Sequence, residues 1–298
     1  MRNIANQADS ITSRTLIHPL SCVSILILLL TTSLPMVGCS ILGSRAKANE
    51  TRILTAPAVP GQSLRVNTVN GRVIIAVDKT RQDVNIEANI TTTGSTTEEA
   101  SDRLKTVAVI VNQAEGNVLD ISVDYGPEGR KSSDACSFNI TLPAVSGIFV
   151  QSSNGSIKLT DTTGAADLHT SNGSVTLTRH DGSAVIKTSN GSLKLEGITG
   201  DMDARTSNGS ITYTATPNNN NLFSLHTSNG SIHITIPQSM SGTINTSTSN
   251  GRVNISTIPE NTTVTGDKKH RTIVLGSTGQ PVSEARTSNG NITININP

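Results

Sequence analysis

The sequence predicts an all-β protein: a β-solenoid (β-helix-like) of 18–21-residue repeats with an N-terminal β-rich block carrying one short helix. The tripeptide Ser-Asn-Gly occurs seven times, and the glycines from Gly155 to Gly209 follow one another at steps of 18 residues. The next two steps, to Gly230 and Gly251, are 21 residues. A unit that recurs at fixed spacing is typical of proteins that stack one structural repeat on the next. Aromatic residues make up 2% of the chain and Trp is absent, so aliphatic layers and backbone ladders must supply the stability.

Residues 1–39 are predicted to be a lipoprotein-type signal peptide that ends at the lipobox Cys39. Arg2 and Arg14 precede an apolar run over 23–30, and Gly38 precedes the cysteine. The run is too short to span a bilayer comfortably. We therefore expect export and lipid anchoring to the bacterial cell envelope, with ordinary secretory cleavage or an uncleaved anchor as alternatives. Ser40, in place of Asp, favours the outer membrane if the organism is Gram-negative.

Residues 40–52 are predicted to be a flexible tether, because 43–52 have almost no apolar content. Cys22 lies in the apolar run and Cys39 is the expected lipidation site, which leaves Cys136 as the only thiol of the mature domain. We expect no intrachain disulfide and a buried, inert thiol at Cys136.

Residues 53–144 form the expected N-terminal β-rich block. Alternating or continuous apolar patterns predict strands at 64–66, 73–77, 84–88, 119–123 and 138–142. The two earliest of these strands flank Asn70-Gly71, an isolated relative of the repeat marker. One helix is expected over 95–104, where Thr96 and Glu99 have the spacing of a capping box.

Residues 145–298 are the expected Ser-Asn-Gly repeat region, continuous with the block. Apolar residues recur two and four positions after each glycine and five and seven before it, so each repeat supplies two short strands with one inward face. The step from Gly251 to Gly290 is 39 residues, which predicts two repeats with one degenerate marker. The turn and ladder residues are expected to be Asn154, Gly155, Asn172, Gly173, Asn190, Gly191, Asn208, Gly209, Asn229, Gly230, Asn250, Gly251, Asn289 and Gly290.

Two architectures fit these repeats. In a solenoid, equivalent strands of successive coils pair about 4.8 Å apart, whereas in a meander of hairpins the two strands of one repeat pair with each other. Near-identical residues at equivalent positions favour the solenoid, because ladders of like side chains depend on sameness. Asn-Gly tolerates positive φ at successive positions, which predicts a tight corner there.

The lipoprotein-like start, the strand block with one helix, and the runs of strand, Ser-Asn-Gly and strand resemble the bacterial putative-adhesin family, whose function is uncharacterised. The resemblance covers about 53–298 and rests on pattern. It implies a β-solenoid-like fold at the cell envelope and no established catalytic residues. Fold alone does not fix function.

The sequence shows no clear catalytic or metal-binding pattern. We expect six acids of the repeat region to share no repeat position and to be solvated loop residues: Asp161, Asp167, Asp181, Glu196, Asp201 and Asp203. His169 and His226 occupy equivalent positions but lie three repeats apart, without a Cys or carboxylate at ligand spacing. We expect no enzyme activity, no cofactor and no metal.

One outward column forms a candidate contact stripe, four residues before the marker glycines. Its basic members are His169, Lys187, Arg205, His226 and Arg286, and Gln151 and Ser247 occupy the same position. The stripe is either a solvated face that discourages sheet association or a contact line for an anionic envelope polymer or a partner surface. The net charge of +1 does not suggest nucleic acid.

We therefore expect a non-enzymatic envelope lipoprotein that acts as an adhesin-like or scaffolding β-repeat surface. Its expected partners are the membrane, through the N-terminal lipid, and an anionic envelope polymer or a membrane protein. Two alternatives remain open: a β-helical carbohydrate-active enzyme, which needs convergent acids, and a regulatory envelope protein that binds a membrane protein partner.

Overall fold

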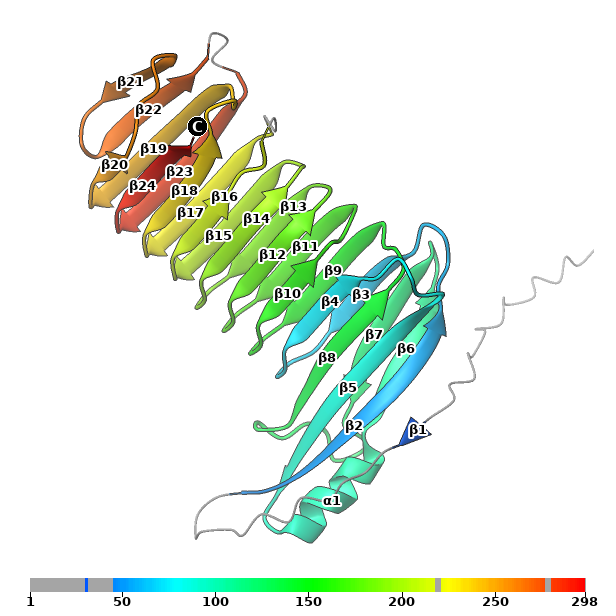
Figure 1. The fold of residues 1–298 in the computed structure, drawn as a ribbon. Coiled ribbons are helices and arrows are strands. Elements are labelled where there is room, and N and C mark those ends of the chain that lie inside the picture. The colour runs from blue at the N-terminus through cyan, green and yellow to red at the C-terminus, as the bar shows by residue number, and fades with distance from the viewer. Residues whose placement is uncertain (1–29, 32–44, 218–220, 277–279, 298) are drawn as a thin grey trace, which may run out of the picture.

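The protein is an elongated all-β solenoid in which two long sheets lie face to face (Figure 1). A computed structural model describes residues 30–31, 45–217, 221–276 and 280–297. The predicted fold class is confirmed. The proposed lipidation site Cys39 and nearly all of the predicted signal peptide lie outside the described residues.

The N-terminal half forms the proximal end of the stack. Its elements are β1 (Leu30–Thr31), β2 (Ala46–Pro57), β3 (Ser63–Asn67), β4 (Val73–Val77), β5 (Asp83–Gly94), α1 (Thr97–Thr106), β6 (Ala108–Ala114), β7 (Val118–Asp124) and β8 (Ala135–Leu142). β2, β5 and β8 pair antiparallel in turn, as do β6 and β7. We call this antiparallel end of the stack the proximal cap. The helix α1 contacts β2 and β5 and lies at this end of the molecule in Figure 1.

The predicted helix begins with half of the expected capping box. The Thr96 hydroxyl accepts a hydrogen bond from the Glu99 backbone N–H at 3.1 Å. The Glu99 carboxylate accepts from the backbone N–H of Ser95, at 2.8 Å, instead of from Thr96. The first turn is thus held one residue further upstream than the spacing predicts.

The tether prediction is wrong for residues 46–52. These residues belong to β2, which pairs with β5 from Ala46 opposite Gly94 to Pro57 opposite Asp83. Arg52 also donates hydrogen bonds to the carbonyl oxygens of Val107 and Leu104. Low apolar content was misleading because only Leu54 and Ala56 of this strand are fully buried, while backbone pairing holds the rest.

The repeat region supplies the remaining strands. They are β9 (Gly147–Ser152), β10 (Ile157–Thr160), β11 (Ala165–Thr170), β12 (Val175–His180), β13 (Ala184–Thr188), β14 (Leu193–Ile198), β15 (Met202–Asn208), β16 (Ile211–Thr214), β17 (Phe223–Asn229), β18 (Ile232–Pro237), β19 (Gly242–Asn250), β20 (Val253–Ile255), β21 (Thr262–Gly266), β22 (His270–Leu275), β23 (Val282–Asn289) and β24 (Ile292–Asn297).

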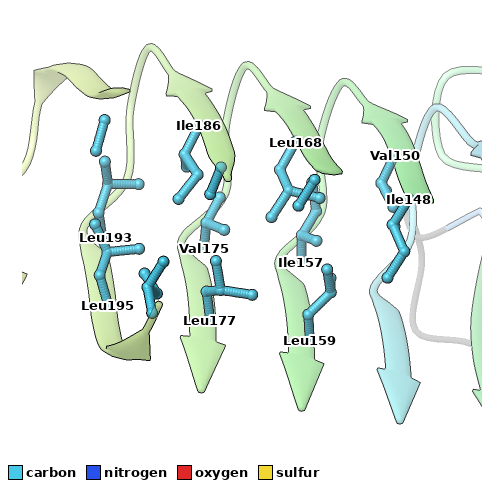
Figure 2. Close-up of a cluster of buried hydrophobic side chains, with 14 of the residues drawn as sticks. Ile148, Val150, Ile157, Leu159, Leu168, Val175, Leu177, Ile186, Leu193 and Leu195 are labelled. Carbon is cyan, nitrogen blue, oxygen red and sulfur yellow. The ribbon is translucent and has the colours of Figure 1, made fainter. Parts of the chain in front are cut away.

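Successive repeats stack as coils, each made of one strand in each sheet joined at an Asn-Gly corner. Equivalent residues pair in parallel, as Ile157 does with Val175 and Val175 with Leu193. Of the two architectures that fit the sequence, the repeats therefore form the solenoid and not the meander of hairpins. We call the sheet that contains β10 and β12 sheet A and the sheet that contains β9 and β11 sheet B. Figure 2 shows their aliphatic side chains meeting in one continuous core.

The isolated marker Asn70-Gly71 is the first corner of this stack. β4 pairs with β10 and β3 with β9, all in parallel. Asn70 and Asn154, which are 84 positions apart in the sequence, are thus neighbours in space. β7 and β8 add a further layer beneath β3 and β4, so the N-terminal block and the repeats share one core.

The order of the last two coils differs from their order in the sequence. The strand orders β17-β23-β19 in sheet B and β18-β24-β20 in sheet A insert the C-terminal repeat between two earlier ones. The prediction of a degenerate repeat between Gly251 and Gly290 is therefore wrong. That interval instead contains β20 and the hairpin of β21 and β22, and β22 pairs antiparallel with β19 at the distal end of sheet B.

The marker glycines are required by close packing of backbones. A Cβ on Gly191 would lie 2.0 Å from the carbonyl oxygen of Gly173, and the same contact recurs from coil to coil. The seven Ser-Asn-Gly glycines do not have positive φ, so the reason predicted from turn chemistry is wrong. Gly71 does have positive φ, at 148°.

Two side-chain ladders follow the Asn-Gly corners. The Nδ2 of each Ser-Asn-Gly asparagine donates to the Oδ1 of the asparagine in the neighbouring coil, over seven bonds of 2.7–2.8 Å from Asn70 to Asn250. One residue before six of the seven Ser-Asn-Gly tripeptides, a buried Thr hydroxyl donates to the glycine carbonyl of the adjacent coil, as Thr188 does to Gly173 at 3.0 Å. Ser152 takes the place of Thr before the first tripeptide. The predicted ladder role of the asparagines is visible in these bonds.

Replacing Thr188 with Val should destabilise the stack by about 1 kcal/mol, because the part-buried carbonyl of Gly173 loses a hydrogen-bond donor while the shape of the side chain is kept. Urea unfolding followed by circular dichroism measures the change. Thr212→Val, at an exposed position of sheet A, is the matched control. Equal stability of the Thr188 variant and the control would contradict a stabilising role for this ladder.

One buried histidine makes the fold sensitive to acid. His180 is fully buried, with Nδ1 2.9 Å from the Thr162 hydroxyl and Nε2 3.3 Å from the Ser183 carbonyl oxygen. Burial lowers the pKa of His180 from its ordinary value of 6.5. Since the unfolded chain then binds the proton more readily, stability is fully present above pH 6.5 and falls as the pH drops below it.

We expect His180→Gln to flatten the loss of stability between pH 7 and pH 5 relative to the native chain. Thermal unfolding at a series of pH values measures this, with His233→Gln, at an exposed position of sheet A, as the control. An unchanged pH profile in the His180 variant would show that other groups cause the acid sensitivity.

Candidate functional site: the outer face of sheet B

The structure brings the predicted basic residues together on consecutive strands of sheet B. His169 lies beside Lys187, Lys187 beside Arg205, Arg205 beside His226, and His226 beside Arg286. We call these five residues the basic column, with Gln151 and Ser247 at its two ends. Arg286 joins the column directly after His226 only because the C-terminal coil is inserted there, so the column is more continuous than the sequence order implies.

A second column, which we call the acidic column, lies two residues earlier on the same strands. It contains Asp167, Asp203 and Glu284, and Phe149, Val185, Ser224 and Asn245 occupy the same position on the other strands. The prediction that the six acids of the repeat region share no repeat position is therefore wrong for Asp167 and Asp203. Both lie six residues before a marker glycine. Counting back from each glycine would have found them.

The two columns are joined by ion pairs within three of the strands. Arg205 Nε is 2.9 Å from Asp203 Oδ1, and Arg286 pairs with Glu284. His169 Nε2 is 3.3 Å from Asp167 Oδ1. Lys187 has Val185, not an acid, two residues before it. With neutral histidines, the three basic and three acidic side chains cancel, so this face is not a uniformly positive surface.

His226 lies between two arginines of the basic column. Burial, together with Arg205 and Arg286, lowers the pKa of His226 although Asp203 opposes the shift. His226 Nε2 is 3.6 Å from Glu284 Oε2 and makes no hydrogen bond. The imidazole is thus neutral at pH 7, and protonation adds positive charge to this face only in acid.

The side chains along the two margins of this face are mostly small or apolar. The serines of the Ser-Asn-Gly markers border the basic column, and most of them are exposed. On the other side, Leu222 and Val282 are 40% and 43% exposed, and Val185, within the acidic column, is 37% exposed. These three are most of the large apolar side chains that the described residues expose. Shallow hollows flank Arg286, one beside Arg205 and Ser249 and the other beside Asn245 and His270.

Two of the expected loop acids line a depression on another part of the surface, together with Lys79 and Arg179. Arg179 holds Asp161 through Nε–Oδ1 and Nη2–Oδ2 contacts of 2.5 and 2.7 Å. This pairing lowers the pKa of Asp161, which keeps its carboxylate ionised and unsuited to donate a proton. The second acid, Asp181, accepts a hydrogen bond from Thr199.

Other reactive groups give little chemistry. Burial raises the pKa of Cys136 to about 12, so the thiol stays protonated at neutral pH. The described part of the chain contains no cluster of three or more His, Cys, Asp or Glu side chains arranged to hold a metal ion. Within the same residues, no helix has the length and apolar character needed to cross a bilayer.

Comparison with known proteins gives one family and several remote structures. The family model described as Toastrack DUF4097 matches residues 32–295. A putative adhesin from Bacteroides fragilis is 13% identical with a TM-score of 0.40, over 86% of this chain and 100% of that one. A putative cell adhesion protein from Clostridium sporogenes is 11% identical with a TM-score of 0.30, over 85% and 100%. A putative adhesin from Parabacteroides distasonis is 10% identical with a TM-score of 0.33, over 85% and 98%. The search of curated proteins gives no match.

Proposed function

The chain belongs to the Toastrack DUF4097 family, and we propose that it is a non-enzymatic, adhesin-like or scaffolding protein that binds another protein through the outer face of sheet B. In this proposal the chain is exported and held at the cell envelope by a lipid on Cys39, at the outer membrane if the organism is Gram-negative. The observation that carries the binding role is the pair of oppositely charged columns on one exposed face.

The solenoid suits a surface that must keep its shape. Each inner strand of sheet B is hydrogen-bonded on both sides, and its inward side chains pack in the continuous core. The outward side chains of the basic and acidic columns therefore keep a fixed spacing along the stack. A rigid platform loses little conformational entropy when it binds a partner.

The arrangement of charge favours a protein partner over an anionic polymer. A polyanion needs a surface of one sign, whereas Arg205 and Arg286 each have an acid on their own strand. Protein interfaces match positive groups against negative ones and gain specificity from that match. Of an anionic polymer and a protein, the charge arrangement thus favours a protein as the partner of the basic column.

The test compares binding of the full chain to envelope proteins and to fractionated envelope polymers, at low and high salt. One variant removes the positive charges, with Lys187→Gln, Arg205→Gln and Arg286→Gln. A second removes the negative charges, with Asp167→Asn, Asp203→Asn and Glu284→Gln. The control neutralises Lys158 and Lys194, which lie on sheet A.

A protein partner with complementary charge predicts that both variants lose binding while the control keeps it. Binding that falls in the first variant but rises in the second identifies an anionic polymer instead and overturns the choice of partner. Binding that neither variant changes, or no binding to any fraction, overturns the role of this face.

A further inference from the structure

We propose that the protein partner of this face is a second copy of the same chain, docked so that the two solenoids run in the same direction. This inference rests on the proposed function, because it names the partner of the same face. It follows from the order of charges across the strands, from the apolar margin and from the size of the face.

A two-fold axis along the stack places unlike columns opposite each other. Turning one copy by half a turn about that axis exchanges left and right across the face but keeps each strand at the same height. The basic column of one copy then meets the acidic column of the other. Arg205 faces the second copy's Asp203, and Arg286 faces its Glu284, because each pair shares one strand.

The remaining strands fit the same arrangement without a clash of like charges. His169 meets the second copy's Asp167, and Lys187 meets its Val185, over which the lysine stem can lie. At the two ends of the face, Gln151 meets Phe149 and Ser247 meets Asn245. On β17, His226 meets Ser224. These matches use the pairing register along β9, β11, β13, β17 and β19.

The opposite orientation is unfavourable. A two-fold axis along the strands keeps left and right but reverses the stack, so the two basic columns lie over each other and the two acidic columns do the same. Like charges placed together across an interface are strongly disfavoured. The charge pattern therefore selects the parallel dimer and rejects the antiparallel one.

The margins of the face also match. In the parallel arrangement the exposed marker serines of one copy lie opposite the other margin of the second copy, where Ala165, Leu222 and Val282 are small or apolar and Asp201 is an exposed acid. Leu222 and Val282 lie two residues before Ser224 and Glu284, which are paired neighbours, so their exposed side chains form one patch. A serine opposite a larger aliphatic side chain allows two flat sheets to approach closely.

The size of the face is close to what a specific interface needs. Its seven strands run from β9 to β19, and about seven residues of each contribute to the face. At roughly 4.8 Å between strands and roughly 3.3 Å per residue, this area is about 750 Å² per copy. Standard protein interfaces bury about 800 Å² per partner.

Sedimentation analysis of the purified full chain, native and with charges altered, tests this proposal. The native chain should form dimers. Asp203→Lys with Glu284→Lys should raise the dimer dissociation constant at least about tenfold, because lysine then faces arginine on β15 and on β23. Exchanging the two columns on the three strands that carry an acid, with Asp167→His, His169→Asp, Asp203→Arg, Arg205→Asp, Glu284→Arg and Arg286→Glu, should restore the dimer.

Cross-linking with a short bismaleimide then determines the orientation. The chain carries Cys22→Ser and Cys39→Ser, and receives either Gln151→Cys at the proximal end of the face or Ser247→Cys at the distal end. The parallel dimer predicts that each variant cross-links to itself. Cross-linking only in a mixture of the two variants indicates the antiparallel dimer and contradicts the proposal.

The outcomes separate this inference from the proposed function. A monomeric native chain, or a dimer that charge reversal leaves intact, overturns the self-association. If such a chain still binds envelope proteins in a manner that both charge-removal variants abolish, the proposed function is retained and only the identity of the partner is wrong.

Discussion

Replacing Gly191 with Ala should destabilise the solenoid by about 3 kcal/mol or more, the largest loss we expect from a single methyl group in this chain. The added Cβ would lie 2.0 Å from the Gly173 carbonyl oxygen and 2.5 Å from its carbon. These atoms belong to a backbone paired on both sides, so the coil cannot move aside without breaking the stack. The urea midpoint and the yield of folded protein report the loss.

Gly147→Ala is the matched control, because its Cβ would approach the Ser63 hydroxyl at 3.1 Å and not the backbone of a marker glycine. A small change for Gly147 beside a large one for Gly191 supports backbone stacking at the markers. Similar stability of the two variants would contradict it.

Asp134→Ala should destabilise the proximal cap by about 3–5 kcal/mol, because it removes one partner of a buried ion pair. Asp134 is 0% and Arg103 4% exposed, with Nη2 of the arginine 2.8 Å from Oδ2 of the aspartate. Burial alone raises the pKa of Asp134, but hydrogen bonds from Arg103, Lys131 and Thr93 outweigh it and the pKa is lowered. Without Asp134, the Arg103 charge remains in the interior with Glu128, which is largely exposed, as its remaining ion-pair partner.

Two comparisons test this explanation. The double variant Asp134→Leu, Arg103→Met should recover much of the lost stability, since apolar groups can replace a buried pair at little cost. Lys105→Ala, which removes the exposed pair with Asp102, should change little. Equal stability of Asp134→Ala and Lys105→Ala in urea would contradict the importance of the buried pair.

Much of the fold could be predicted from the sequence because the repeat is nearly exact. Apolar positions on both sides of each Asn-Gly marked the inward face, and sameness between repeats indicated stacking in parallel. The coil order could not be predicted in the same way. Asn289 stacks on Asn229 and Asn250 on Asn289 through identical hydrogen bonds, so a marker carries no information about which marker it contacts.

The site was predicted in part. The position of the basic column followed from the repeat, but its continuity depended on the inserted coil that brings Arg286 beside His226. The acidic column was missed because its members are interrupted by Val185 and Ser224. β2 was missed because pairing with β5 stabilises polar residues that have no apolar pattern of their own.

Photo-cross-linking in cells that express the chain tests the central claim most directly, namely that the outer face of sheet B binds protein. A thiol-reactive photo-cross-linker is attached at Ser228→Cys on this face or at Thr212→Cys on the outer face of sheet A. The chain carries Cys22→Ser, the lipid is expected to occupy Cys39, and Cys136 is buried with a raised pKa, so the reagent reacts with the new thiol. The account predicts protein cross-links from position 228 and few from position 212. Equal cross-linking from both positions, or none from position 228, would contradict it.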